Sequence, residues 1–339
     1  MRNARILLLV LGSLACRAAP SRPPEPAPVA WEFAARGVSG KGDAQRFGRA
    51  DFEALRELGA RDFAFVPFGV LPGPYSPLVS FREPEPWHDE LVRAAHACGL
   101  RVLLKPHLWI DQSWHGAVRM ASDESWRTFF ARYTEFLRTW AEFAAAHGVE
   151  VLCIGTELDR TLGQEREWRK LIAELRRVYS GRLLYTAHWQ HVEDVPFQDA
   201  LDAIGVSAYY PLAVADDATV DELRRAWEPI RAGLATLARR HDRPIVFTEV
   251  GWRPIRGALA QPWVHGGRGE LDPELQARAY EAVLTAFEGE PWFGGLYFWE
   301  WFSLASFDQR WPLASSTGYS PQGHPAEDVL RRFWGARLR

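Results

Sequence analysis

Two glutamates are the residues of this chain best placed to do chemistry. Glu157 lies near the end of the apolar run 149–158, and Glu249 lies near the end of the apolar run 244–252. A carboxylate at the end of a buried strand is costly to keep ionised unless partners or a function hold it there. Two such carboxylates suggest acid/base chemistry. Because they lie 92 positions apart, only a fold that gathers strand ends around one centre can bring them together.

The elements that must position these glutamates alternate along the chain. Beyond residue 30, short apolar runs alternate with longer amphipathic ones, which is typical of parallel strands joined by crossover helices. Several runs are continuous in Val, Ile, Leu and Phe, as expected for strands covered on both faces. The predicted strands are 32–39, 62–70, 101–109, 150–158, 182–189, 203–210, 245–252 and 295–301. The predicted helices are 51–59, 87–98, 123–147, 165–179, 192–200, 220–241, 273–288 and 325–334.

Eight alternations in about 300 residues favour a single α/β domain, a (β/α)8 TIM barrel over residues 31–339, rather than an open sheet. Two helices have clear start signals: a capping box formed by Thr219 and Glu222, and Asp272 followed by Pro273. The first strand is not followed by Gly-x-Gly-x-x-Gly, and the sequence contains no Walker loop. Nucleotide-binding folds therefore lose their main support.

In such a barrel the loops after the strands form one face, and the chemistry takes place there. The strand ends predict a polar and aromatic rim on this face. The loops after strands 2, 3, 7 and 8 are long enough to build the walls of a cleft, and they span 71–86, 110–122, 253–271 and 302–320. The rim residues are Lys105, His107, Trp109, Glu157, His188, Trp189, Tyr209, Tyr210, Glu249, Trp252, Trp299, Glu300 and Trp301.

This rim suits the cleavage of a glycosidic bond. One carboxyl group must protonate the leaving oxygen, and another must attack the sugar or activate water. Flat tryptophan rings at strand ends can stack on the C–H face of a pyranose. Five tryptophans lie at predicted strand ends, where each can stack on a sugar or have a structural role alone, and together they favour carbohydrate: Trp109, Trp189, Trp252, Trp299 and Trp301. The plainer alternative is that each glutamate only pairs with a lysine or arginine at the rim.

Other polar rim residues have two interpretations. Lys105, His107, His188 and the pair Tyr209-Tyr210 can donate hydrogen bonds to sugar hydroxyls or hold the nucleophile, or they can have structural roles alone. The chain has ten histidines, yet strand 1 lacks the His-x-His pair of metal-dependent barrel hydrolases. We therefore expect neither a catalytic metal nor any other cofactor.

At this point the chain resembles the clan A (β/α)8 glycoside hydrolases, and most closely glycoside hydrolase family 113, the β-mannanase group. The resemblance covers about residues 31 to 335. It implies that Glu157, at the end of strand 4, is the general acid/base and that Glu249, at the end of strand 7, is the nucleophile. Many clan members carry Asn where this chain has Thr156, whereas family 113 members resemble it in having Gly-Thr-Glu. The resemblance rests on Leu104-Lys105-Pro106-His107, Gly155-Thr156-Glu157-Leu158, Ser207-Ala208-Tyr209-Tyr210-Pro211-Leu212, Thr248-Glu249-Val250-Gly251-Trp252 and Phe298-Trp299-Glu300-Trp301.

These residues predict a retaining glycoside hydrolase that acts on β-linked hexose poly- or oligosaccharides such as β-1,4-mannan. We expect Glu249 to attack the anomeric carbon, and Glu157, held protonated by its less polar surroundings, to protonate the leaving oxygen. The alternative is a non-catalytic, surface-anchored carbohydrate-binding lipoprotein with a degenerate site. The residues expected to bind substrate are Lys105, His107, Trp109, His188, Trp189, Tyr209, Tyr210, Trp252, Trp299 and Glu300.

The composition and the start of the chain indicate where the protein works. The formal net charge is −3, so nucleic acid is not an expected partner. Residues 1–16 resemble a secretory signal ending in Cys16, as in bacterial lipoproteins, and 17–30 form a proline-rich tether. We expect an exported monomer, in the cell envelope or secreted, that touches the membrane only through a lipid on Cys16. Cys98 and Cys153 are expected to be buried free thiols.

Overall fold

The computed structural model describes residues 31, 34–40, 46–111, 113–266, 268–306 and 317–335. The predicted signal 1–16 with Cys16 and the predicted tether 17–30 lie outside the described residues. The strands are β1 (Ala35–Gly40), β2 (Asp62–Phe65), β3 (Phe68–Leu71), β4 (Arg101–Leu104), β5 (His107–Ile110), β6 (Val151–Thr156), β7 (Arg182–His188), β8 (Ala203–Ser207), β9 (Ile245–Val250) and β10 (Phe293–Trp301). The α-helices are α1 (Arg49–Leu58), α2 (Pro86–Ala97), α3 (Asp123–Ala146), α4 (Glu165–Val178), α5 (Val220–His241), α6 (Pro273–Ala286) and α8 (Pro325–Gly335).

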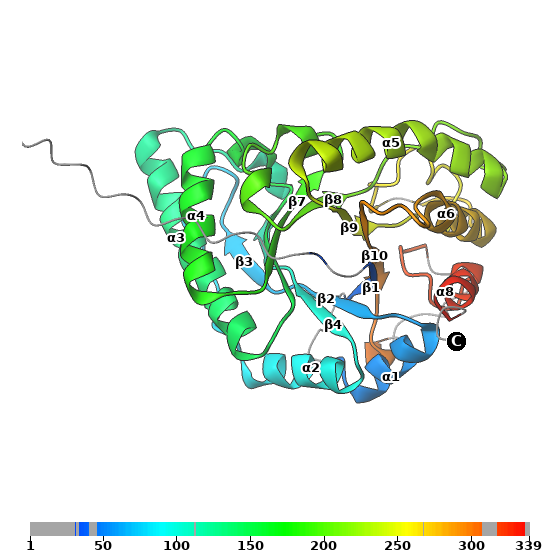
Figure 1. Cartoon of the computed structure of the whole chain (residues 1–339), viewed down its shortest axis with the longest axis horizontal. Helices are drawn as coiled ribbons and strands as arrows, with labels where there is room; N and C mark the ends of the chain where they lie inside the picture. Colours follow the sequence, from blue (N-terminus) through cyan, green and yellow to red (C-terminus); the bar gives the residue numbers. More distant parts are fainter. Residues whose placement is uncertain are drawn as a thin grey trace, which may run out of the picture.

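In the described part of the chain, eight parallel strands close into a barrel in the order β1, β10, β9, β8, β7, β6, β4 and β2. The helices surround this barrel (Figure 1). Each barrel strand contains residues of one predicted strand, and strand neighbours follow the chain order around the barrel. The structure thus confirms the predicted (β/α)8 barrel.

The barrel strands are buried on both faces, which explains their continuous apolar runs. Toward the helices, their outward side chains join one large core that includes Trp168 and Trp227. The barrel interior is filled mostly by small and aliphatic side chains, as in other barrels of this kind. The interior cluster consists of Ala35, Ala64, Leu103, Val151, Cys153, Leu184, Ala203, Val246 and Tyr297. Polar side chains suited to chemistry therefore have to come from the strand ends.

The predicted strands 62–70 and 101–109 are wrong in one respect, because each is two strands. β2 and β4 pair within the barrel, whereas β3 and β5 form a separate two-stranded parallel sheet. Pro67 and Pro106 lie at the two breaks, and proline has no N–H to donate to a strand ladder. The barrel strand β4 therefore ends just before Lys105, and His107 begins β5.

The predicted helix 192–200 is also wrong. The structure has two short 3-10 turns there, Val192–Asp194 and Gln198–Ala200. Pro196 lies between them, and Val195 has an extended backbone with ψ of 109°. A residue before proline is disfavoured in the helical region, so a continuous helix cannot form through this segment.

The helix start signals are confirmed. Thr219 Oγ1 accepts a hydrogen bond from the backbone N–H of Glu222, and the Glu222 carboxylate accepts one from the backbone N–H of Thr219 at 2.8 Å. The Asp272 side chain accepts from the backbone N–H of Leu275 at 2.9 Å, ahead of Pro273 at the first turn of α6. These contacts satisfy N–H groups that the helices leave free and fix where α5 and α6 begin.

Two remaining sequence features concern membranes and thiols. No helix among the described residues has both the length and the apolar character needed to cross a membrane. Cys98 and Cys153 are both free thiols, as expected. Cys153 is buried in β6, whereas Cys98, at the end of α2, is partly exposed rather than buried.

Candidate active site

Glu157 and Glu249 both lie at the carboxyl-terminal mouth of the barrel. Glu249 belongs to β9, and Glu157 directly follows β6. The backbone of Glu157 has φ of 49°, in the left-handed region that non-glycine residues rarely adopt. This turn is held by hydrogen bonds from the backbone N–H of Glu157 to the Thr186 carbonyl and from the N–H of Leu158 to the Tyr185 hydroxyl, both 2.8 Å. The strained turn re-aims the Glu157 carboxyl at the strand end.

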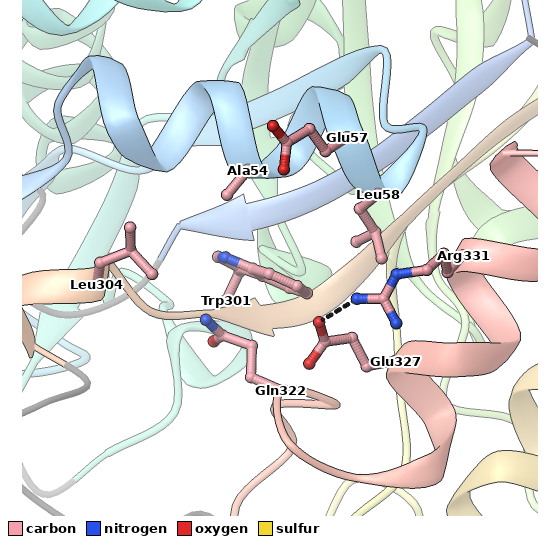
Figure 2. A pocket seen from close by; sticks show the side chains of 8 residues that line it. All are labelled: Ala54, Glu57, Leu58, Trp301, Leu304, Gln322, Glu327 and Arg331. Carbon is pink, nitrogen blue, oxygen red and sulfur yellow. Dashed lines mark hydrogen bonds and ion pairs between the residues drawn. The ribbon is translucent and has the colours of Figure 1, made fainter.

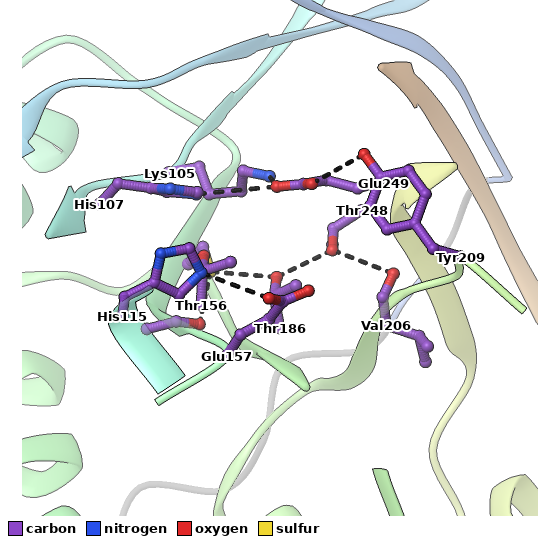
Figure 3. Close-up of polar contacts among 12 residues, drawn as sticks. Lys105, His107, His115, Thr156, Glu157, Thr186, Val206, Tyr209, Thr248 and Glu249 are labelled. Carbon is purple, nitrogen blue, oxygen red and sulfur yellow. Dashed lines mark hydrogen bonds and ion pairs between the residues drawn. The ribbon is translucent and has the colours of Figure 1, made fainter. Parts of the chain in front are cut away.

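Two side chains bind the carboxylate of Glu249, and a third lies close to it (Figure 3). Lys105 Nζ, on a side chain without exposed surface, forms an ion pair and hydrogen bond with Glu249 Oε1. The Tyr209 hydroxyl donates to Oε2 at 3.1 Å, and His107 Nε2 lies 3.8 Å from Oε1. A buried carboxylate needs a close cation and hydrogen-bond donors, and this one has both. These contacts fix the position of the Glu249 side chain.

The groups around Glu249 have defined protonation states. Burial, reinforced by the charges of Lys105 and His115, holds the pKa of His107 well below its usual value, so this imidazole is neutral. Burial and the charge of Glu249 hold the pKa of Tyr209 well above its usual value, so the phenol keeps its proton. Lys105 thus supplies the positive charge, and Tyr209 supplies a neutral hydrogen-bond donor.

Glu157 has a different environment, made by the loop after β5. Trp114 Nε1 donates a hydrogen bond to Glu157 Oε2 at 2.9 Å, and His115 Nε2 lies 3.3 Å from the same oxygen. Burial favours a raised pKa, but the hydrogen bond and charge of His115, the charge of His188 and the Trp114 hydrogen bond together lower the pKa of Glu157 to about 2. The expectation that less polar surroundings keep Glu157 protonated is not met, because these donors stabilise the carboxylate and lower its pKa.

The two carboxylates belong to one polar cluster. The ring centroids of His107, beside Glu249, and His115, beside Glu157, are 5.7 Å apart. The phenol of Tyr209 is affected by the charges of both glutamates. The cluster rests on hydroxyls of the barrel interior, where Thr186 and Thr248 are joined by a hydrogen bond of 2.8 Å (Figure 3).

Aromatic side chains surround the polar cluster on two sides. His188 packs against Trp114 at 5.6 Å and against Trp189 at 5.5 Å between ring centroids. Trp189 in turn stacks on Trp263 of the loop after β9, with centroids 5.9 Å apart and 30° between planes. Tyr210 is buried beneath Trp189 and against the core, so its ring supports Trp189 instead of lining the cleft.

Two predicted sugar-stacking tryptophans do not face the cleft. Trp252 has no exposed surface and packs edge-on against Trp227 and at 61° to Tyr280, in the layer between barrel and helices. The ring of Trp301 lines a cavity of about 220 Å³ between α1 and α8 (Figure 2). Both expectations are wrong. Strand alternation turns Trp252 outward, because it lies three residues beyond Glu249, whereas at Trp301 the pairing register of β10 with β1 shifts and breaks the alternation.

The other residues predicted for the third and eighth strands, which the structure shows as β4 with β5 and as β10, lie near the barrel mouth. The Trp299 ring is partly exposed, and Lys105 Nζ lies 5.5 Å from its centroid. Glu300 is buried at 3% exposure, and its charge acts with that of Glu249 on the Tyr319 phenol, whose pKa burial already raises. Trp109 lies on β5 with 58% of its surface exposed.

Sequence reasoning assigned no role to three residues next to Glu157. Trp114 and His115 contact its carboxyl group, and their only signal was their place in a long loop after a strand end. Asp159, two residues beyond Glu157, has a side chain that is 8% exposed and lies 3.9 Å from His191. In the described part of the chain, no three His, Cys, Asp or Glu side chains are grouped so as to hold a metal ion.

Glu157 and Asp159 have opposite effects on the way stability depends on pH. Since the pKa of Glu157 falls from 4.5 to about 2 on folding, its stabilisation is complete above about pH 4.5 and is lost as the pH falls toward 2. This stabilisation is roughly 3 kcal/mol. Burial raises the pKa of Asp159 from 3.8 to about 7, so this group destabilises the fold as the pH rises through that interval.

Measuring Tm over a range of pH tests the predicted effects of Glu157 and Asp159. We expect Glu157→Gln to flatten the fall in Tm between pH 4.5 and 2. We expect Asp159→Asn to raise Tm above pH 7 and to leave it unchanged near pH 4. Parallel curves for the wild type and both variants would contradict the two shifted pKa values.

Comparisons with known proteins agree with this geometry. The family model of Glycoside Hydrolase Family 113 matches residues 31–323. A family 113 β-mannanase from Alicyclobacillus acidocaldarius, solved in complex with ManMIm, is 30% identical, with a TM-score of 0.79 over 91% of this chain and 99% of that one. The search of curated proteins found no match.

More distant structures show the fold alone. A family 113 β-1,4-mannanase is 23% identical, with a TM-score of 0.78 over 90% of this chain and all of that one. A β-glucuronidase from Bifidobacterium dentium, in complex with coumarin-3-O-glucuronide, is 16% identical, with a TM-score of 0.59. That match covers 89% of this chain and 46% of the glucuronidase, so the barrel corresponds to part of a longer protein.

Proposed function

This chain belongs to glycoside hydrolase family 113 and is a glycoside hydrolase, and from that premise we propose that it cleaves β-1,4-linked mannan with retention of the anomeric configuration. Glu249 is the nucleophile in this proposal, and Glu157 is the general acid/base. The names of the two similar proteins, a β-mannanase and a β-1,4-mannanase, support the substrate class.

One observation carries the mechanism: the two carboxyl groups share a polar cluster but have different partners. Glu249 is bound by Lys105 and Tyr209, which pair with its carboxyl group and hold it oriented. Such a carboxylate is suited to attack an anomeric carbon, because it needs no proton removed and little reorganisation. In the first step a bond forms between a Glu249 oxygen and the anomeric carbon while the bond to the leaving oxygen breaks.

Glu157 delivers the proton to the leaving oxygen in this proposal. His115 Nε2 lies 3.3 Å from Glu157 Oε2 and favours the carboxylate. When the substrate replaces solvent, desolvation raises the pKa of Glu157, so its carboxyl group takes up a proton and passes it to the leaving oxygen. In the second step Glu157 takes a proton from water, whose oxygen attacks the anomeric carbon and releases Glu249.

The residues around the carboxylates have a binding role in this proposal. His188 and Tyr209 offer polar groups toward the sugar, and Trp189, Trp263 and Trp299 offer ring faces. The stacked pair Trp189 and Trp263 adjoins His188, whose charge acts on the acid/base Glu157. We therefore assign this pair to the leaving-group side of the scissile bond.

The test measures the reducing ends that the purified protein releases from β-1,4-mannan, β-1,4-glucan and β-1,4-xylan. A Glu157→Gln/Glu249→Gln double variant is the control. We expect activity on mannan that the double variant lacks. Activity on glucan or xylan without mannan would overturn the substrate class. Binding without any hydrolysis would support the carbohydrate-binding alternative.

A further inference from the structure

The small sheet of β3 and β5 exposes an apolar face at the barrel mouth. The two strands pair in parallel, with Phe68 opposite His107 and Val70 opposite Trp109. Phe68, Val70 and Trp109 are 49%, 43% and 58% exposed. Side chains alternate along a strand, so these residues share one side of the sheet with His107. The buried side consists of Gly69, Leu71, Leu108 and Ile110.

A row of rings leads from Glu249 onto this face. His107 Nε2 lies 3.8 Å from Glu249 Oε1. The Phe68 ring stands edge-on to His107 with centroids 6.0 Å apart, and it stands edge-on to Trp109 at 6.2 Å. Two residues of strand separate His107 from Trp109, a rise of roughly 7 Å. The exposed face is thus continuous with the nucleophile's surroundings and extends away from them.

We propose that Phe68, Val70 and Trp109, called here the β3–β5 platform, form a binding subsite for hexose units on the glycone side of the scissile bond, with the Trp109 ring as its stacking surface. This inference rests on the proposed function and specifies how that site selects longer chains. The glycone side follows from position, because the row of rings begins at the nucleophile, which bonds to the glycone sugar.

The surroundings of the platform suit a sugar chain. Isolated exposed hydrophobic residues are common. Three on adjacent strands beside a catalytic cleft form a patch, and such patches mark binding sites. Phe68 and Val70 also border a cavity of about 540 Å³ to which Arg82, Glu83 and Trp87 contribute. A flat ring suits the C–H face of a pyranose, and charged hydrogen-bonding groups nearby suit the hydroxyls around its edge.

The barrel order places the platform away from the other exposed aromatic pair. β3 and β5 continue from β2 and β4, whereas Trp263 follows β9, which lies opposite β4 in the closed barrel, and stacks on Trp189 after β7. Since that pair is assigned to the leaving-group side, the two aromatic groups flank the carboxylates. A variant in one aromatic group can therefore serve as the control for a variant in the other.

The experiment uses aryl β-glycosides of mannose, β-1,4-mannobiose and β-1,4-mannotriose with one activated aryl group, so that only the glycone changes. We expect kcat/KM of the wild type to rise with glycone length. In Trp109→Ala the increase in kcat/KM with glycone length should be about tenfold smaller, which is the scale of one aromatic contact. Trp109→Phe should keep most of the increase. Trp263→Ala should keep the full dependence on glycone length. Equal losses on all three substrates, or none, would overturn the platform.

A binding measurement separates this inference from the proposed function. Calorimetry with β-1,4-mannotetraose compares Glu249→Gln with Glu249→Gln/Trp109→Ala, so neither protein turns the ligand over. We expect about tenfold weaker binding for the double variant. Equal affinities would overturn the platform even if the wild type hydrolyses mannan. Weaker binding together with a wild type inactive on every substrate would support the platform and overturn the proposed hydrolysis.

Discussion

Glu249→Gln is expected to lower kcat on mannooligosaccharides by roughly 10⁴-fold or more, because it removes the only group in the proposed mechanism that bonds to the anomeric carbon. The amide has nearly the shape of the carboxyl group, so substrate can still enter the cleft. Steady-state kinetics measures the loss, and calorimetry with the same oligosaccharides measures retained binding. A kcat within about tenfold of the wild type would contradict the nucleophile assignment.

This variant also changes the fold's electrostatics, so it needs a control. Lys105 is fully buried against Glu249, and replacing the carboxylate leaves that ammonium group uncompensated. Glu249→Asp keeps the negative charge for Lys105 but shortens the side chain by one methylene. We expect it to be folded and nearly as inactive as Glu249→Gln. Activity near the wild-type level in Glu249→Asp would show that attack from this position is not required.

Glu157→Gln is expected to show an effect that depends on the leaving group. Without the acid, kcat/KM on mannooligosaccharides should fall by roughly 10²–10⁴-fold, the usual contribution of a general acid. A dinitrophenyl glycoside needs no protonation of its leaving oxygen, so formation of the glycosyl enzyme should be nearly unaffected. Its breakdown, which needs Glu157 as base, should be slow. Rapid mixing should therefore show a burst of dinitrophenol followed by slow turnover.

External azide gives the matching control for both glutamates. In Glu157→Ala, azide can attack the glycosyl enzyme without a base, and we expect a glycosyl azide with the substrate's β configuration. In Glu249→Ala, azide can replace the nucleophile, and we expect the α-azide from an activated β-glycoside. The same anomer from both variants would contradict the division of roles between Glu157 and Glu249.

The sequence was enough to predict the barrel and the position of both glutamates. Continuous apolar runs indicate strands buried on both faces, and their order along the chain is their order around the barrel. Once the strands are parallel, carboxyl-terminal positions such as Glu157 and Glu249 must lie at one mouth. The two predicted strands that continue through Pro67 and Pro106 are in fact interrupted there, since proline lacks an N–H.

The electrostatic state of the acid could not be predicted in the same way. The partners of Glu157, Trp114 and His115, come from a loop some 40 positions away, and no periodicity specifies how such a loop folds back. Strand-end tryptophans are equally ambiguous, because the direction of the backbone decides their environment. Trp252 ends in the core and Trp109 on an exposed face, although both follow apolar runs.

The most direct test of the central claim is the anomer that the enzyme releases first. Proton NMR during early hydrolysis of a β-1,4-mannooligosaccharide distinguishes the two product anomers before they interconvert. If Glu249 and Glu157 act as a nucleophile and an acid/base in one site, the β-anomer appears first and the α-anomer follows by mutarotation. Initial release of the α-anomer would mean direct attack by water and would contradict the proposed roles of both glutamates.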